Sequence, residues 1–211
     1  MLNKIEDKYI KIITSEYCRL DDLIDLPADK LIEVDMGCGK GSFSTQLAAR
    51  FPERMVISAD IMIGRLRKLV KRNEREGVAN IHALRVEARQ LLGMMVPDRA
   101  IHRLHILCPD PWPKDRHRAN RLLCSDFMGQ IHRILKPGGM FHFSSDDVSY
   151  LEAVRKVVMM SQLFEEYPAG MEDIAELKTD FERLWNGMGK AVSHNVWRRR
   201  EIVKAPDYRG H

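Results

Sequence analysis

Short apolar runs alternate with amphipathic segments through most of the chain. Five runs have the length and composition of buried strands, at residues 31–37, 55–60, 80–87, 100–108 and 140–147. Segments with apolar residues at helical spacing follow four of them, at 42–51, near 62–77, at 125–135 and at 148–161. Two further strands are expected near 163–167 and 191–203. The alternation predicts an α/β fold with a doubly wound, mostly parallel sheet of seven strands, the C-terminal pair antiparallel.

The chain of 211 residues is long enough for one sizeable core. We expect residues 31–211 to form a single domain. Residues 1–30 are expected to be an N-terminal helical extension, with no role that the sequence indicates.

Carboxylates stand at or next to the point where each of the first five predicted strands ends. In order they are Asp35, Asp60, Glu87, Asp110 (two residues after Cys108) and the pair Asp146 and Asp147. Ligands of open α/β sheets bind beyond the carboxyl ends of the strands. A purely structural sheet has no need of this pattern, which therefore predicts a polar binding site at that edge.

The first strand runs into DMGCGKG, with glycines at positions 37, 39 and 41. Glycine permits positive φ and lets a ligand approach the backbone, so the turn is typical of a binding loop, although tight packing alone would also favour glycine. The dinucleotide fingerprint would need glycine or alanine where this chain has Ser42. The spacing thus fits a GxGxG loop better than a pyrophosphate cradle.

Asp60 ends the second strand about 20 residues after this loop, where an acid can accept both hydroxyls of a ribose. Glu87, ending the third strand, can lie near the base of the same nucleoside. The structural alternative for Asp60 is a helix N-cap.

Together these features resemble the class I S-adenosylmethionine-dependent methyltransferases, and CPDPWPKDRHRANR (108–121) resembles the PDPWxKxRHxxRR motif of the tRNA (guanine-N7-)-methyltransferases. LKPGGMFHFSSDD and TDFE (179–182) resemble two further family segments, so the resemblance covers roughly residues 31–200. It implies the Rossmann-like class I fold, S-adenosyl-L-methionine as cofactor and tRNA as partner. The implied cofactor-binding residues are Asp35, Gly37, Gly39, Gly41, Asp60, Glu87, Ala88 and Cys108.

The chain departs from the family pattern at several acids. Asp35 and Asp60 stand where glutamate is common, Glu87 precedes Ala88 where aspartate is usual, and the fifth strand ends in Ser-Asp-Asp instead of Thr-Asp. Each change keeps the charge, so distances and affinity are affected more than the expected activity.

Guanine N7 has a lone pair and no proton, so its methylation needs position and charge rather than a general base. A carboxylate favours the positive charge that develops on the base, and the prolines around Asp110 hold that residue in a preset backbone. The resemblance also assigns the catalytic role to Asp110. Trp112 could stack on the base or pack between the prolines.

Acidic acceptors suit the guanine edge that carries N1–H and the amino group, and the resemblance implies Asp146, Thr179 and Glu182 there. Thr-x-x-Glu is also a capping box, so Thr179 and Glu182 could serve a helix start. The expected phosphate contacts are basic residues that follow Trp112, namely Lys114, Arg116, Arg118 and Arg121. Arg198, Arg199 and Arg200 are a weaker addition.

Composition excludes some classes of protein but does not identify this one. The net charge is only +4, the four cysteines and eight histidines show no metal-ligand spacing, and no apolar run suits a membrane span or signal peptide. We expect a cytoplasmic protein without a metal site.

Alternatives that stay open are methylation of another RNA or of an exocyclic amine, a nucleotide-binding oxidoreductase and a non-catalytic RNA-binding module. The sequence leaves the oligomeric state open, and only the resemblance implies the tRNA variable loop.

Overall fold

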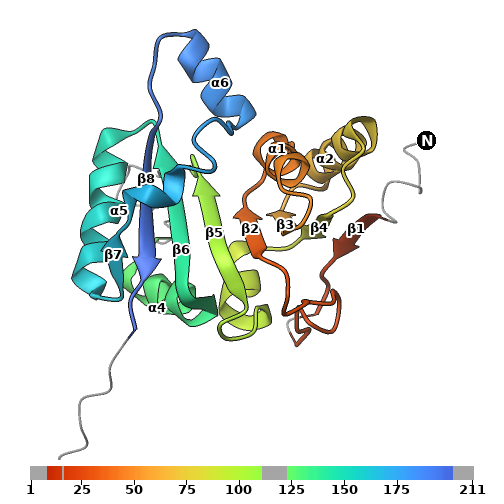
Figure 1. Cartoon of the computed structure of the whole chain (residues 1–211), viewed down its shortest axis with the longest axis horizontal. Helices are drawn as coiled ribbons and strands as arrows, with labels where there is room; N and C mark the ends of the chain where they lie inside the picture. The colour runs from red at the N-terminus through yellow and green to blue at the C-terminus, as the bar shows by residue number, and fades with distance from the viewer. Residues whose placement is uncertain (1–8, 16, 111–122, 202–211) are drawn as a thin grey trace, which may run out of the picture.

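The computed structural model describes residues 9–15, 17–110 and 123–201. Eight strands form one sheet in the order β1-β4-β3-β2-β5-β6-β8-β7 (Figure 1). The strands are β1 (Ile10–Ile12), β2 (Ile32–Met36), β3 (Met55–Asp60), β4 (Ile81–Arg85), β5 (Ile101–Leu107), β6 (Leu135–Ser145), β7 (Phe164–Glu166) and β8 (Ser193–Arg199).

Strands β1 to β6 pair in parallel, and β8 lies antiparallel between β6 and β7. The seven predicted strands and their directions are confirmed, but the count of seven is wrong by one. The eighth strand, β1, pairs with β4 from within the segment expected to be helical. Where this segment is described, residues 9–15 and 17–30 form the strand and turns, without an α-helix. Leu20 and Ile24 are buried in the main core, so the segment is packed against the sheet.

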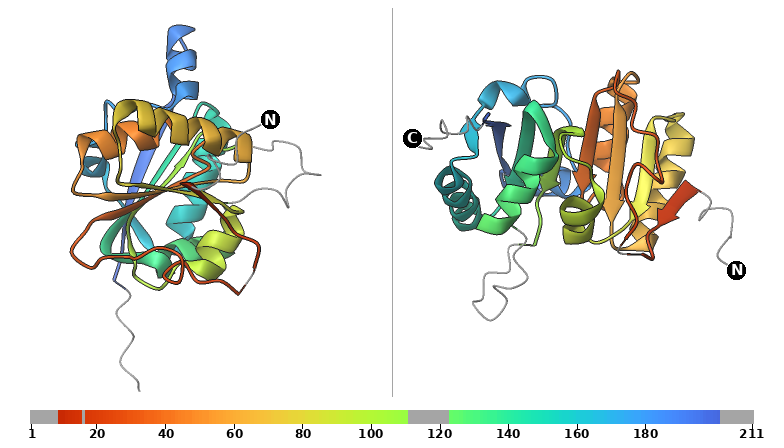
Figure 2. Two further views of the ribbon diagram at one scale, coloured as in Figure 1. Left: turned by 90° about the vertical axis from the view of Figure 1, so that its right-hand side faces the viewer. Right: turned by 90° about the horizontal axis from the view of Figure 1, so that it is seen from below.

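Helices cover both faces of the sheet (Figure 2). α1 (Ser42–Arg50) and α2 (Ile63–Glu76) lie on one face. The short α3 (Ala88–Gln90), the π-helix η2 (Leu91–Met95), α4 (Ser125–Ile134) and α5 (Val148–Ser161) belong to the other. The 3-10 helix η4 (Pro168–Met171) contacts β8, and α6 (Asp180–Gly187) rises beyond the carboxyl ends of the parallel strands (Figure 1).

Local signals explain where the long helices begin and end. Gly77 adopts φ 68° and closes α2, as predicted, while the carboxylate of Asp147 accepts a hydrogen bond from the Tyr150 N–H at the start of α5. The N-cap of α4 is Cys124, one residue before the predicted cap Ser125. Strands β2 and β3 are buried along their whole length, acids included, which matches their position inside the sheet with a neighbouring strand on each side.

Candidate active site

The glycine loop between β2 and α1 has the backbone that its composition predicts. Gly37, Gly39 and Gly41 adopt φ values of 79°, 58° and 74°, in the left-handed region that favours glycine. A Cβ at Gly41 would also lie 2.5 Å from Leu69 Cδ1 on α2, so the close approach of α1 and α2 requires glycine there. A Cβ at Gly37 or Gly39 would meet nothing within 4 Å, so this side of the loop is open to a ligand.

Asp60, at the end of β3, ties the loop to the start of α2. Its Oδ2 accepts a hydrogen bond from the Gly39 N–H at 3.0 Å, and its Oδ1 accepts one from the Met62 N–H at 2.7 Å. Arg65 Nη1 lies 3.5 Å from Oδ2. The N-cap of α2 is Met62, so Asp60 supports the helix start without being the cap. Its ribose role stays a prediction, and it requires the carboxylate to exchange one of these partners for a hydroxyl.

Asp35 lies within β2 and is buried, with its carboxylate accepting a hydrogen bond from Ser44 Oγ on α1. Burial raises the pKa of Asp35 to about 7, and the nearby Asp60 carboxylate adds to the rise while Ser44 opposes it. Near neutral pH this carboxyl therefore titrates, unlike an ordinary aspartate.

The third acid, Glu87, follows β4, which lies two strands from β2 in the sheet. Its exposed carboxylate caps α3 by accepting from the Gln90 N–H at 3.0 Å. Ala88 is half-buried against the main core. Both stand at the carboxyl edge, but the contacts that the structure shows for Glu87 are those of a helix cap.

Cys108 directly follows β5 and has a left-handed backbone, φ 46°, which costs a non-glycine residue about 1 kcal/mol or more. Its N–H donates to the Ser144 carbonyl at 2.9 Å, and its Sγ lies 3.5 Å from Ser144 Oγ. Burial raises the pKa of the thiol to about 11, helped by the carboxylates of Asp146 and Glu182. The thiol is therefore protonated at neutral pH and suits a contact more than a nucleophile.

Asp110 is exposed two residues later, immediately before residues 111–122, which lie outside the described part of the chain. The predicted phosphate contacts Lys114, Arg116, Arg118 and Arg121, and Trp112, fall in that segment. Asp110 thus follows the carboxyl end of β5, as the sequence predicts, and β5 pairs with β2 in the sheet.

Asp146, Thr179 and Glu182 come together through α6. Asp146 Oδ2 accepts a hydrogen bond from Trp185 Nε1 at 2.8 Å, and Thr179 Oγ1 accepts one from the Glu182 N–H at 2.9 Å. Thr179 is therefore the N-cap, as the capping-box interpretation predicts. Glu182 instead directs its buried carboxylate toward His194 Nε2, 3.3 Å away, and Lys178 Nζ, 3.8 Å away.

Trp185 was not among the residues that the sequence indicated. It stacks on Phe181 with ring centroids 4.4 Å apart, and it binds Asp146 across 39 residues of sequence. The sequence gives no sign that the side chain of Trp185 would contact Asp146, which follows β6.

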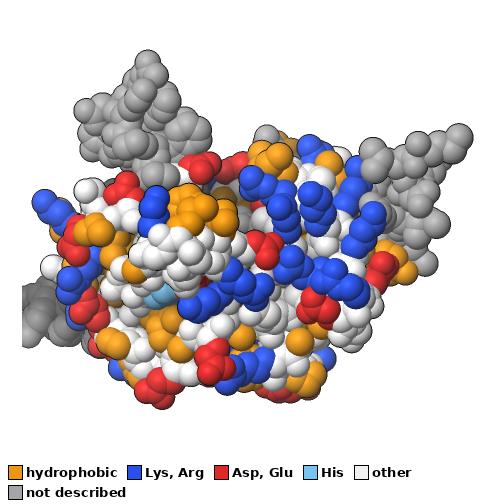
Figure 3. Space-filling view, turned by 90° about the horizontal axis from the view of Figure 1, so that it is seen from above, with side chains coloured by type: hydrophobic (Ala, Val, Ile, Leu, Met, Phe, Trp, Pro, Cys, Tyr) orange, Lys and Arg blue, Asp and Glu red, His pale blue; other side chains and the backbone are white. Residues whose placement is uncertain are grey.

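Positive side chains gather on the face that looks along the sheet from the carboxyl ends of the parallel strands (Figure 3). Helix α2 contributes most of the basic sequence near the site, with Arg65, Arg67, Lys68, Lys71, Arg72 and Arg75. Arg72 also joins α2 to α6 through Asp180, at 3.1 Å. The charge of this surface suits a polyanion.

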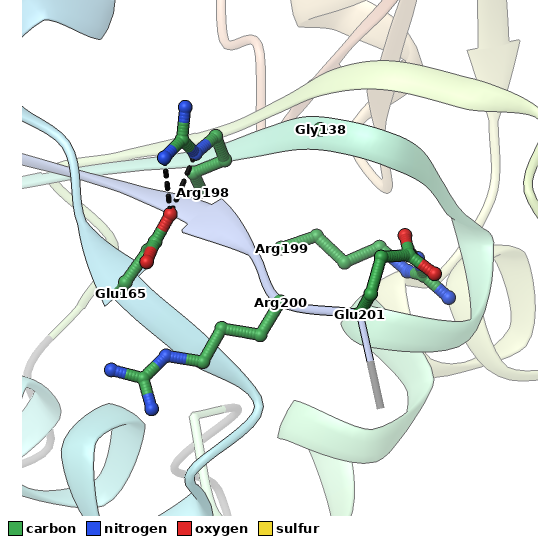
Figure 4. Close-up of a pocket in the computed structure, with 6 residues that line it drawn as sticks. All are labelled: Gly138, Glu165, Arg198, Arg199, Arg200 and Glu201. Carbon is green, nitrogen blue, oxygen red and sulfur yellow. Dashed lines mark hydrogen bonds and ion pairs between the residues drawn. The ribbon is translucent and has the colours of Figure 1, made fainter. Parts of the chain in front are cut away.

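Arg198, Arg199 and Arg200 lie elsewhere, around a hollow with Gly138, Glu165 and Glu201 (Figure 4). Arg198 Nε donates to Glu165 Oε1 at 2.7 Å, and the buried Arg199 donates to the His132 carbonyl at 3.0 Å. Because β8 is antiparallel, its last residues lie at the amino end of β6, away from the glycine loop. The arginines of this run stand outside the candidate site.

The structure therefore brings the predicted residues Asp35, Gly37, Gly39, Gly41 and Asp60 into one cluster, and Cys108, Asp146, Thr179 and Glu182 into a second beside it. Among the described residues, no group of three or more His, Cys, Asp or Glu side chains is arranged to hold a metal ion. None of the described helices is long and apolar enough to cross a membrane.

Comparison with known proteins finds related methyltransferases. Residues 29–195 match the family model Methyltransf_4, described as "Putative methyltransferase". The tRNA (guanine-N(7)-)-methyltransferase of Syntrophotalea carbinolica is 36% identical over 67% of this chain and 65% of its own length. The enzyme of the same name from Nitrosococcus oceani is 30% identical over 81% of this chain and 70% of its own.

A solved structure supports the fold alone. The 16S rRNA methyltransferase KamB superposes with a TM-score of 0.63 at 15% identity, covering 87% of this chain and 95% of that one. This chain spans slightly less than two thirds of the length of the S. carbinolica relative. On the family match and the N. oceani alignment, the chain belongs to the tRNA (guanine-N7-)-methyltransferase family.

Proposed function

We propose that this protein transfers the methyl group of S-adenosylmethionine to N7 of a guanine in tRNA and so forms 7-methylguanosine. The observation that carries the proposal is the meeting of an open glycine loop and a set of acids at the carboxyl edge of β2, β3, β5 and β6. The names of the aligned relatives indicate which reaction such a site would perform.

The glycine loop suits the cofactor because its open side admits a ligand to the backbone. Asp60, beside Gly39, is the candidate partner of the ribose hydroxyls, and Asp35, behind the loop, is the candidate partner of the cationic amino group. Glu87 and Ala88 at the next strand end complete the adenosine side, and Cys108 lies toward the reacting side. The cofactor supplies an electrophilic methyl group on a sulfonium.

The protein's own task is then to place guanine N7 in line with that methyl group. Asp110 would stabilise the positive charge that the base gains, which is an electrostatic role and needs no proton transfer. Asp146 and Glu182 would accept hydrogen bonds from the opposite edge of guanine, and Thr179 sets the start of the helix that carries Glu182.

The RNA that carries the guanine would cross the basic face around α2, with Lys114, Arg116, Arg118 and Arg121 as further phosphate contacts. We expect the guanine to lie in the tRNA variable loop, as the family resemblance implies, and the enzyme to act in the cytoplasm, where tRNA is found. Transfer of label from methyl-labelled S-adenosylmethionine to unmodified tRNA transcripts tests the reaction class.

Calorimetry separates the remaining alternatives. Binding of S-adenosylmethionine with no binding of NAD agrees with the proposal, whereas the reverse would favour a nucleotide-binding oxidoreductase. Cofactor binding without turnover on any RNA would favour a non-catalytic RNA-binding module.

A further inference from the structure

A continuous chain of hydrogen-bonded side chains crosses the sheet and ends at Glu182. Glu33 Oε2 lies 2.8 Å from His105 Nε2, His105 Nδ1 lies 2.9 Å from His142 Nδ1, and His142 Nε2 lies 2.9 Å from His194 Nδ1. His194 Nε2 then faces Glu182 Oε1 at 3.3 Å. The five residues come from β2, β5, β6, β8 and α6, and the four strands are neighbours in the sheet (Figure 1).

The inner end of the chain is anionic. Three cationic or donor groups, those of Arg54, Arg103 and His105, surround the Glu33 carboxylate. Although burial opposes ionisation, these partners lower the pKa of Glu33 to about 2. Its carboxylate can therefore only accept, which makes His105 Nε2 the donor.

The two middle histidines are neutral. Both are buried, and burial lowers the pKa of His105 and brings that of His142 well below the usual value. A neutral imidazole has one donor and one acceptor nitrogen. His105 donates from Nε2, so its Nδ1 accepts from His142 Nδ1–H; His142 Nε2 is then an acceptor and requires His194 Nδ1–H as its donor.

The direction of these bonds decides what His194 presents to Glu182. With Nδ1 already protonated, a neutral His194 would turn the lone pair of Nε2 against the Glu182 carboxylate, which is repulsive. A second proton on Nε2 makes this contact a charge-assisted hydrogen bond. Lys178 Nζ lies 3.8 Å from the same oxygen and gives Glu182 Oε1 a second cationic neighbour.

We infer that His194 is a positioning residue for Glu182: the histidines behind it make its ring a donor on both sides, and the ring holds the Glu182 carboxylate by its Oε1. Oε2 is then the oxygen that can accept from a substrate. This last step rests on the proposed function, since it gives Glu182 a contact with the donor edge of guanine. Other charged or titratable groups near the pair are His142, Lys178 and Cys108.

The first test reads protonation directly, without turnover. Nitrogen-15 NMR of the full chain at pH 7 should show His194 doubly protonated, His142 as the neutral Nδ1–H tautomer and His105 as the neutral Nε2–H tautomer. Signals are assigned with single variants, and His82→Gln in β4 serves as the control that leaves all three unchanged. A neutral His194 ring, or reversed tautomers in the middle pair, would overturn the inference even if no RNA were methylated.

The second test separates positioning from packing. In His194→Gln the amide nitrogen reaches about the place of Nε2 and can still donate to Glu182, whereas in His194→Asn it reaches about the place of Nδ1 and keeps only the inward bond. We expect Asn to lower kcat/KM for tRNA about tenfold or more, with S-adenosylmethionine affinity unchanged, and Gln to keep most of it. Equal losses of kcat/KM in the Gln and Asn variants would contradict the positioning role.

Discussion

Replacing Asp35 with asparagine should stabilise the protein by an amount that grows as the pH rises. Asp35 is 3% exposed in the middle of β2, and its carboxylate is held by Ser44 Oγ, whose hydrogen bond an amide oxygen can also accept. Burial raises the pKa of Asp35 from 3.8 to about 7. The wild-type protein therefore has to bury a charge at neutral pH that the asparagine variant never carries.

The sign and size of this stability difference follow from the linkage between protonation and folding. Because the folded-state pKa lies above the unfolded value, the contribution of Asp35 is fully present below about pH 4 and is lost as the pH rises to about 7. A shift of roughly three units corresponds to about 4 kcal/mol at pH 8 and about 1.5 kcal/mol at pH 5. A fixed penalty for the new amide donors would lower both differences equally, so the growth of about 2.5 kcal/mol between the two pH values is the quantity to measure.

The assay is urea unfolding of wild type and Asp35→Asn at pH 5 and pH 8, with the exposed Asp25→Asn as control. The buried histidines also make stability depend on pH, in the opposite direction, because their lowered pKa values cost stability on acidification. Wild type and variant share this contribution, so it cancels when their free energies of unfolding are subtracted. A difference between wild type and Asp35→Asn that is the same at both pH values would refute the argument from burial.

Three further predictions concern separate parts of the molecule. Glu33→Gln should lower the free energy of unfolding by about 1–3 kcal/mol, because the buried Arg54 and Arg103 lose one of their two carboxylates and keep only Asp173, and a urea midpoint equal to wild type would contradict this. Asp60→Ala should weaken S-adenosylmethionine binding in calorimetry, since it removes the candidate ribose acceptor and loosens Gly39; unchanged affinity would remove that role. Lys114→Ala and Arg118→Ala should raise the KM for tRNA and each reduce the salt slope of binding by about one unit, so an unaltered slope would exclude phosphate contacts at these positions.

Features that depend on a short stretch of sequence could be predicted. The glycines of the loop and the strand ends that carry acids depend on local composition, and the structure reproduces the loop conformation and the positions of Asp60 and Asp110 at the carboxyl edge. Strand β1 was missed because it has three residues with only Ile10 buried, which leaves no alternation to detect. Because this segment has no clear alternation of apolar and polar residues, helix was expected there, which was incorrect for the described residues.

Features that depend on register across the sheet could not be predicted. The three histidines of the chain to Glu182 are 37 and 52 residues apart in sequence, and only the pairing of β5, β6 and β8 aligns their rings. Trp185 and Asp146 meet for the same kind of reason, through the path of α6 above the sheet. By sequence alone these residues are scattered and carry no shared spacing.

In the proposed reaction, Asp110 supports methyl transfer to guanine N7. The most direct test is incubation of wild type and Asp110→Asn with S-adenosylmethionine and unmodified tRNA, followed by nuclease digestion and mass spectrometry of the nucleosides. We expect 7-methylguanosine from the wild type and a strongly reduced yield from the variant, with cofactor affinity retained. Methylation at another atom, or equal turnover by Asp110→Asn, would contradict it.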